Sequence, residues 1–337
     1  MADPDAWLDF RGQIDAALEL LGDREGPATD EKSGELTEVI TLPSLLEQCR
    51  AVAVPVDGVS GEATARPVMR TLHHFACTGG TLISRCTAAM PNTLLLSEVD
   101  PLTTMVHRAA FMPTDLIGLV RRGSRAADQD LLVEIFLAGL GALAAEMRRI
   151  GSDLILRDHA HSHFCFGPTI PERPSLRAML ARDYRVLSLI TVRHPLDSFL
   201  ALGVQDWLRI EPPTLQEYAR RYGVFLDHYA EVPLLRYEDF VTDPESSMQR
   251  VCGLLELSYN PEFREMFPVI ALSGDSGRQG SEIAPRPRRE VPQDVATEAA
   301  RSESYVALCA RLGYDPDPEH PPAPGWKDRG SGMRGSD

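Results

Sequence analysis

The sequence predicts a three-layer α/β fold, in which a parallel β-sheet is flanked by helices on both faces. Short apolar runs alternate with longer helix-like segments, the pattern of parallel strands joined by crossover helices. The clearest of these runs cover residues 72–77, 152–157, 186–193 and 232–240. A chain of 337 residues with 43% hydrophobic content can bury a large core. We therefore expect one such domain with accessory segments at its ends.

Residues 78–81, Thr-Gly-Gly-Thr, form a glycine-rich turn between the first apolar run and a helical pattern. A strand, such a turn and a helix present backbone N–H groups and the positive helix end to a phosphate. The fold is therefore expected to be P-loop-type, with five residues at the phosphate: Thr78, Gly79, Gly80, Thr81 and Leu82. An ordinary β-to-α connection has the same composition, so this turn alone leaves both interpretations open.

Two later runs end at residues suited to bind a ligand. Arg193 ends a buried run, at the carboxyl end of a strand, where open α/β sheets bind ligands. Pro195 then suits the first turn of the next helix. The run over residues 232–240 ends in Arg-Tyr-Glu-Asp-Phe and is followed by Asp243-Pro244 and another helical pattern.

Taken together, these segments resemble the sulfotransferases that use 3′-phosphoadenosine 5′-phosphosulfate (PAPS). The resemblance runs from about residue 70 to about residue 290 and is carried by four segments in the expected order. Residues 78–81 are similar to the family's 5′-phosphosulfate loop, and residues 193–198 to its 3′-phosphate motif. Tyr237-Glu-Asp resembles the family's strand-end segment, and residues 278–280 its late Arg-Lys-Gly loop.

The resemblance implies transfer of a sulfuryl group from PAPS to a hydroxyl or amine of an acceptor. The acceptor would be a small molecule, a lipid or a glycan, and no metal would be required. Besides the loop, the resemblance implies six cofactor-binding residues: Arg193, Ser198, Tyr237, Arg278, Gln279 and Gly280.

Three residues are candidates for catalysis. Arg157 ends the apolar run over residues 152–157 and His159 follows it, where cytosolic sulfotransferases carry a lysine and a catalytic histidine. Tyrosylprotein sulfotransferases instead use a glutamate after the strand that follows the phosphate-loop helix, and Glu98, at the end of the run over residues 94–98, occupies that place here. The resemblance therefore leaves the general base open between His159 and Glu98, with Arg157 near the sulfonate.

Two residues depart from the family's pattern. Cys77 stands where the family has a lysine or arginine before the loop, so Arg157 or Arg85 must supply that charge. Ala201 replaces a serine eight residues after the 3′-phosphate arginine, a loss for which Ser198 could compensate.

These departures keep two alternatives open. One is a catalytically impaired protein that binds PAPS or its desulfated product, 3′,5′-bisphosphoadenosine (PAP). The other is a P-loop nucleotide kinase or hydrolase, which the missing Gly-Lys-Ser/Thr disfavours.

Composition bounds the partners and the compartment. A net charge of −15 disfavours nonspecific binding to nucleic acid or anionic membranes. We expect no membrane span, because Glu134 and Glu146 interrupt the longest apolar stretch, residues 131–147. We expect a cytoplasmic location, because residues 1–10 are acidic and unlike a signal peptide. The cysteines form no Cys-x-x-Cys pair and are expected to be reduced. His159, His161 and His163 alternate and would share one face of an extended chain, but no second ligand spacing completes a metal site.

The chain is expected to divide into three parts. Residues 1–66 form an N-terminal accessory helical segment of unassigned role, residues 67–315 the sulfotransferase-like α/β domain, and residues 316–337 a flexible tail. The arginines at 286, 288 and 289 are either part of a cationic pocket for the cofactor or a solvated basic loop. The sequence predicts neither the acceptor nor the oligomeric state.

Overall fold

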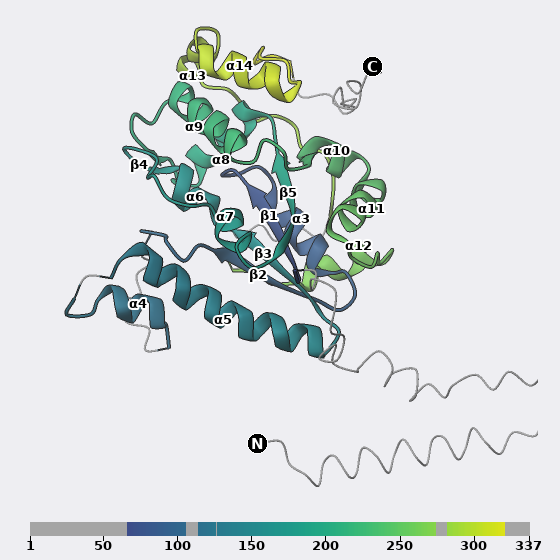
Figure 1. Ribbon diagram of the computed structural model, residues 1–337. Helices are drawn as coiled ribbons and strands as arrows, with labels where there is room; N and C mark the ends of the chain where they lie inside the picture. Colours follow the sequence, from purple (N-terminus) through teal and green to yellow (C-terminus); the bar gives the residue numbers. More distant parts are fainter. Residues whose placement is uncertain (1–65, 106–113, 126, 274–281, 321–337) are drawn as a thin grey trace, which may run out of the picture. The chain divides into compact units, whose positions relative to one another are not determined.

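The computed structural model describes residues 66–105, 114–125, 127–273 and 282–320 (Figure 1). Its centre is a five-stranded parallel sheet with the strand order β2-β3-β1-β5-β7. The five strands are β1 (Val68–His74), β2 (Thr93–Val99), β3 (Asp153–Asp158), β5 (Arg185–Val192) and β7 (Leu234–Arg236). A separate two-stranded sheet pairs β4 (Phe166–Gly167) with β6 (Arg209–Ile210). The predicted α/β fold with a parallel sheet is confirmed.

Helices cover both faces of the sheet, as predicted (Figure 1). One face packs against α3 (Gly80–Ala88), α10 (Tyr237–Thr242), α11 (Pro244–Leu255), α12 (Phe263–Met266) and the 3₁₀ helix η1 (Phe267–Val269). The other face packs against α4 (Leu116–Arg121), α5 (Gln129–Arg149) and α7 (Leu176–Leu180). A third cluster joins α6 (Ala160–Phe164), α8 (Pro195–Val204), α9 (Leu215–His228), α13 (Gln293–Ala299) and α14 (Glu303–Leu312).

The alternation of side chains along β1 and β3 decides which residues meet at the end of the sheet. On β1, Met69 packs with α5 and Leu72 packs with α3, so odd and even positions face opposite layers. Leu72 pairs in register with Arg157 of β3, which places Arg157 on the α3 face. Asp158 lies on the opposite face, where its Oδ2 is 2.8 Å from His73 Nδ1.

Two strands have different bounds from those predicted. The apolar run over residues 72–77 leaves the sheet at His74, because the carbonyl of Phe75 accepts hydrogen bonds from both the N–H and the hydroxyl of Thr78. The run over residues 232–240 is a strand only at Leu234–Arg236, and Tyr237–Thr242 is helical. Acidic residues in the first turn favour that helix start, which the apolar pattern alone did not reveal.

The predicted end segments lie almost entirely outside the described residues. This holds for the accessory segment except residue 66, and for the tail after residue 320. The described part of the tail is tied to the domain, because Arg288 Nη1 donates to the carbonyls of Asp317, Pro318 and His320. In the described ranges, no helix combines the length and the apolar character that crossing a membrane requires. The five cysteines in those ranges are free thiols.

A buried clamp joins the ends of β5 and β7 to the C-terminal segment. Glu238 accepts the N–H of His194 (3.0 Å) and the hydroxyl of Tyr314 (2.5 Å). His194 Nδ1 accepts the N–H of Leu196 at the start of α8, and its Nε2–H donates to the carbonyl of Asp315 (3.0 Å). Burial is the largest cause that lowers the pKa of His194 to about 4, and Arg288 adds to it. This clamp requires a neutral imidazole.

The clamp predicts an acid-sensitive fold. His194 has an ordinary pKa of 6.5 in the unfolded chain and about 4 in the folded one. Between these values the unfolded state binds more protons, so the free energy of unfolding falls as pH is lowered, by about 3 kcal/mol for this one group. In His194→Asn, which keeps a cap acceptor but cannot titrate, that part of the fall is absent. Urea unfolding from pH 4 to 7 measures it, and a constant stability difference between the two proteins would contradict it.

Candidate functional site

A cavity of about 1030 Å³ opens at the carboxyl ends of the central strands. Its wall contains nine of the predicted site residues: Thr78, Gly79, Gly80, Thr81, Leu82, Glu98, Arg157, His159 and Tyr237. Four arginines and three carboxylates line it, in a chain whose net charge is −15. The cavity is thus far less acidic than the protein as a whole. The predicted residues Arg278, Gln279 and Gly280 lie outside the described residues.

Both glycines of the turn make room for aromatic rings. Gly79 has a φ of +85°, and a Cβ there would lie 2.3 Å from Cδ2 of Tyr237. A Cβ on Gly80 would lie 2.4 Å from Cγ of His74. We expected these glycines to let the backbone approach an anion, and the structure adds a different requirement for each of them. The sequence suggests that His74, inside or beside a strand, is structural; the structure places it in the cavity wall.

The turn provides fewer donors than expected. The hydroxyl of Thr78 is buried and donates to the carbonyls of Phe75 (2.8 Å) and Thr191 (3.2 Å). The N–H of Leu82 donates to the carbonyl of Gly79 (3.1 Å). Thr78 and Leu82 therefore shape the turn and α3. Within the described ranges the amides of Gly80 and Thr81 have no hydrogen-bond acceptor, as is usual for the first residues of a helix. These two N–H groups can bind an anion.

Arg157 connects the turn to the end of β2. Its side chain is 4% exposed, and its Nη2 lies 3.0 Å from both the Thr81 hydroxyl and Nε2 of His74. Its Nη1 bonds to the Ser97 hydroxyl (2.7 Å) and to Oε1 of Glu98 (2.9 Å). The guanidinium is thus fixed beside the first turn of α3. Of the two arginines expected to supply the charge that Cys77 lacks, Arg157 is the one that contacts this turn.

Glu98 holds two cavity residues together. Its Oε1 pairs with Arg157, and its Oε2 lies 3.2 Å from Nε2 of His159. The pairing of β2 with β3 is irregular at this point, and Glu98 has a φ of 60°. Bulges re-aim side chains beside active sites, and left-handed backbone at a non-glycine residue marks local strain. Cys77 and Asp206, also in the cavity wall, share this conformation.

Arg193 follows β5 directly and stacks on Tyr237, with its guanidinium carbon 5.0 Å from the ring centre. Because Tyr237 also packs on Gly79, this cation lies next to the cavity wall without lining it. Ser198 is completely buried in α8 and does not line the cavity. Ala201 does line it. The structure therefore places Ser198 away from the cavity, and its hydroxyl cannot compensate for the serine that Ala201 replaces.

The other arginines separate into different roles. Arg85 lines the cavity, but its guanidinium donates to the carbonyls of Phe267 and Pro268. Arg288 pairs with Asp197 (2.9 Å) and holds the C-terminal segment, so it belongs to neither predicted alternative. Arg286 lines the cavity.

One part of the cavity wall is aromatic and apolar. Trp207, Phe166 and Met105 line it, whereas Phe164 is fully buried in the core. His161 faces Trp207 edge-on, and burial, with a smaller effect of His159, lowers its pKa to about 4. Its Nε2 is buried without a partner in the described part of the chain.

The three alternating histidines do not lie on an extended chain. His161 and His163 belong to the short helix α6, and His163 stacks on Phe164 with its Nε2 3.2 Å from the carbonyl of Pro171. The shared face that would make them metal ligands is therefore absent. Residues 66–105, 114–125, 127–273 and 282–320 contain no group of three or more potential metal ligands.

Comparison with solved structures finds sulfotransferase domains. The sulfotransferase domain from the curacin biosynthetic pathway is 16% identical; the match covers 75% of this chain and 99% of that one, with a TM-score of 0.45. The sulfotransferase domain of the Synechococcus PCC 7002 olefin synthase is also 16% identical; the match covers 75% of this chain and 98% of that one, with a TM-score of 0.43. Mouse sulfotransferase SULT7A1, solved in complex with PAP, is 12% identical; the match covers 73% of this chain and 89% of that one, with a TM-score of 0.38.

The chain is similar in structure to sulfotransferase domains. No family model matches it, and no curated protein is similar to it in sequence. Identities of 12–16% carry no information on substrates, which must be argued from the residues of the cavity.

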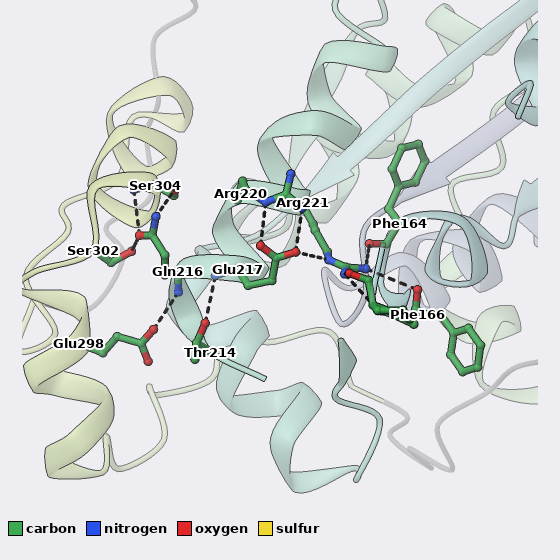
Figure 2. Close-up of polar contacts among 12 residues, drawn as sticks. Phe164, Phe166, Thr214, Gln216, Glu217, Arg220, Arg221, Glu298, Ser302 and Ser304 are labelled. Atoms are coloured by element: carbon green, nitrogen blue, oxygen red, sulfur yellow. Dashed lines mark hydrogen bonds and ion pairs between the residues drawn. The ribbon is translucent and has the colours of Figure 1, made fainter. Parts of the chain in front are cut away.

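A fully buried arginine of α9 fixes the segment that carries Phe166 into the cavity wall. Arg221 bonds through Nε to Glu217 (2.6 Å), whose own N–H is capped by the hydroxyl of Thr214 (Figure 2). Its Nη1 and Nη2 donate, at 2.9–3.4 Å, to four carbonyls: those of Phe164, Phe166, Gly167 and Pro168. The neighbouring Arg220 pairs with the same carboxylate but is 48% exposed.

This contrast gives a matched pair of variants. Arg221→Met removes a fully buried cation from a partly buried carboxylate and from four carbonyls, so we expect a loss of stability of about 3–5 kcal/mol. Arg220→Met removes an exposed partner and should cost less than about 1 kcal/mol. Urea unfolding at pH 7 measures both. Equal effects would show that Arg221 does not hold this segment.

Proposed function

We propose that the protein is a PAPS-dependent sulfotransferase. The observation that supports this most strongly is the position of Arg157, buried between a phosphate-binding turn and the Glu98–His159 pair in one cavity. An acceptor hydroxyl or amine attacks the sulfur, a new oxygen–sulfur or nitrogen–sulfur bond forms, and the sulfur–oxygen bond to the phosphate breaks. PAP leaves, and the acceptor's proton passes to a base on the protein.

The amides of Gly80 and Thr81, at the positive end of α3, suit the 5′-phosphate. Arg193, whose planar fork can bond two phosphate oxygens, suits the 3′-phosphate. Tyr237 packs between Arg193 and Gly79 and thereby fixes the spacing of these two anion sites. Two separated phosphate sites favour PAPS over a nucleoside triphosphate, and the turn lacks the lysine that a kinase requires.

Arg157 replaces the cation that is missing at Cys77. Its guanidinium contacts the hydroxyl of Thr81 at the first turn of α3, where charge develops on the sulfonate and on the departing oxygen. A preorganised donor of this kind is worth roughly 3–4 kcal/mol in comparable oxyanion sites. Cys77 is therefore compatible with catalysis, which makes the binding-only alternative less well supported.

His159 is the base, and Glu98 orients it. Both carboxylate oxygens of Glu98 are engaged, one by Arg157 and one by Nε2 of His159. When Nε2–H donates to Glu98, Nδ1 of His159 remains as the proton acceptor, the same division of roles as in hydrolase triads. Glu98 then stabilises the imidazolium that forms.

The acceptor has an apolar body and is held by the aromatic wall of Trp207, Phe166 and Met105. The buried Nε2 of His161 beside Trp207 offers one hydrogen bond to a second polar group of the acceptor. A small aryl or alkyl alcohol fits this description best. Transfer from PAPS needs no metal among these residues.

Calorimetric titration with PAP tests the cofactor. We expect micromolar binding by the wild type, and a roughly 10- to 100-fold loss in Arg193→Ala because a charged hydrogen bond to phosphate disappears. Arg289→Ala, an exposed arginine outside the cavity wall, is the matched control and should bind as the wild type does. No binding of PAP, or preference for ATP with Mg²⁺, would overturn the proposal.

Radiolabelled PAPS and a panel of aryl and alkyl alcohols test the catalytic residues. We expect His159→Asn to lower kcat roughly 100- to 10,000-fold, the usual contribution of a general base, with PAP affinity unchanged. Glu98→Gln keeps a hydrogen-bond acceptor but loses the charge, and its loss should be smaller. A larger loss in Glu98→Gln than in His159→Asn would make Glu98 the base. Tight PAP binding without transfer to any alcohol would support the binding-only alternative.

A further inference from the structure

We infer that His74 is a positioning residue of the transfer site, and that position 80 is a glycine because the His74 imidazole occupies the space beside it. His74 holds the guanidinium of Arg157 against the first turn of α3. This inference rests on the proposed function in one respect, the role of Arg157 at the sulfonate. It assigns a function to a histidine that no motif of the sequence singled out.

The contact between His74 and Arg157 has a defined direction. Nε2 of His74 lies 3.0 Å from Nη2 of Arg157, and a guanidinium only donates hydrogen bonds. Nε2 is therefore the acceptor, and the proton of the neutral ring lies on Nδ1, which is buried without a partner in the described part of the chain. The same Nη2 also donates to the Thr81 hydroxyl at 3.0 Å. His74 and Thr81 together fix where this nitrogen lies.

The surroundings of His74 keep it neutral. Burial is the largest cause that lowers its pKa well below the usual value, followed by Arg157, His159, His73 and His161. A protonated ring would present a second donor to Arg157, and the contact would be lost. The adjacent His73 has a different role on the opposite face, where it bonds to Asp158 and Thr71.

Gly80 is explained by space rather than by backbone conformation. It is the first residue of α3 and does not have the left-handed φ that Gly79 has. The three atoms nearest to a Cβ on Gly80 are Cγ, Cδ2 and Nδ1 of His74, at 2.4, 2.5 and 2.8 Å. Any larger residue at position 80 must push the imidazole away, and with it the acceptor of Arg157. His74 and Gly80 are thus one structural unit.

A double-mutant cycle tests this unit, with affinity for PAPS relative to PAP as the readout. PAP lacks the sulfonate, so displacement of Arg157 should weaken PAPS and leave PAP almost unchanged. We expect Gly80→Ala to lower the PAPS-to-PAP affinity ratio at least 5-fold, and His74→Ala to do the same. In His74→Ala the space is empty, so adding Gly80→Ala should change the ratio less than 2-fold. Additive effects of the two substitutions would overturn the inference.

Two further variants separate positioning from a merely structural role. His74→Gln keeps a hydrogen-bond acceptor near the position of Nε2. Its PAPS-to-PAP affinity ratio should therefore be higher than that of His74→Ala, whereas the ratio of His74→Leu should not. In Gly79→Ala the added Cβ meets Tyr237 instead of His74. Adding His74→Ala should therefore not change the effect of Gly79→Ala on the affinity ratio. The assignment would be contradicted if His74→Gln had no higher PAPS-to-PAP affinity ratio than His74→Leu. It would also be contradicted if adding His74→Ala restored the ratio in Gly79→Ala.

Nitrogen NMR of the histidines distinguishes failure of this inference from failure of the proposed function. We expect His74 to be neutral at pH 7 with its proton on Nδ1, whether or not PAP binds. A wild type that binds neither PAP nor PAPS, but shows this tautomer, would refute the function and keep the His74–Arg157 contact. A protonated ring or the opposite tautomer would refute the contact itself.

Discussion

The site depends on the hydrogen bonds and the ion pair that surround the guanidinium of Arg157. A buried charge without partners costs several kcal/mol, so a side chain that is 4% exposed must be surrounded by groups that accept its hydrogens. The groups within about 3.0 Å come from three elements: His74 from β1, Thr81 from α3, and Ser97 and Glu98 from β2. The requirement to satisfy one cation therefore brings the glycine-rich turn and the Glu98–His159 pair to the same point. It also explains why the backbone at Glu98 departs from regular strand geometry, since a regular strand alternates its side chains and would not turn Ser97 and Glu98 toward one partner.

The part of the cavity wall around Gly79 and Tyr237 is organised by contacts of a different kind. Tyr237 packs on Gly79 and under Arg193, and the next residue, Glu238, accepts the N–H of His194. Burial raises the pKa of Glu238, while the hydroxyl of Tyr314 and the His194 N–H act in the other direction. Tyr237 thus faces the cavity, whereas the adjacent Glu238 faces the core. This is why a short Tyr-Glu segment at the end of β7 can determine the position of an arginine at the end of β5.

The sequence predicted the sheet, the helices on both faces and the strand ends that carry Glu98, Arg157 and Arg193, because apolar periodicity and parallel connections report directly on these features. It did not predict which side chain packs against each glycine of the turn. Gly80 lies beside His74 only because β1 ends and α3 begins at particular angles, and spacing along the chain contains no such information. Ser198 and Ala201 show the same limit. They are three residues apart on α8, yet one is buried in the core and the other lines the cavity. Arg288 was grouped with Arg286 by proximity in sequence, and the structure separates them by their partners.

The resemblance to sulfotransferases implies a lysine or arginine where this chain has Cys77, and under the proposed function Arg157 supplies that charge. A cation placed on the turn itself would be carried by a flexible side chain, whereas Arg157 extends from a strand of the sheet and is held on two sides. Holding it there requires an acceptor beneath the turn that does not compete for the anion, and a neutral imidazole meets this condition because its free nitrogen bears a proton rather than a negative charge. The imidazole in turn requires the smallest residue at position 80. His74, Gly80 and Arg157 therefore belong to one arrangement, in which the cation beside the turn extends from a strand of the sheet.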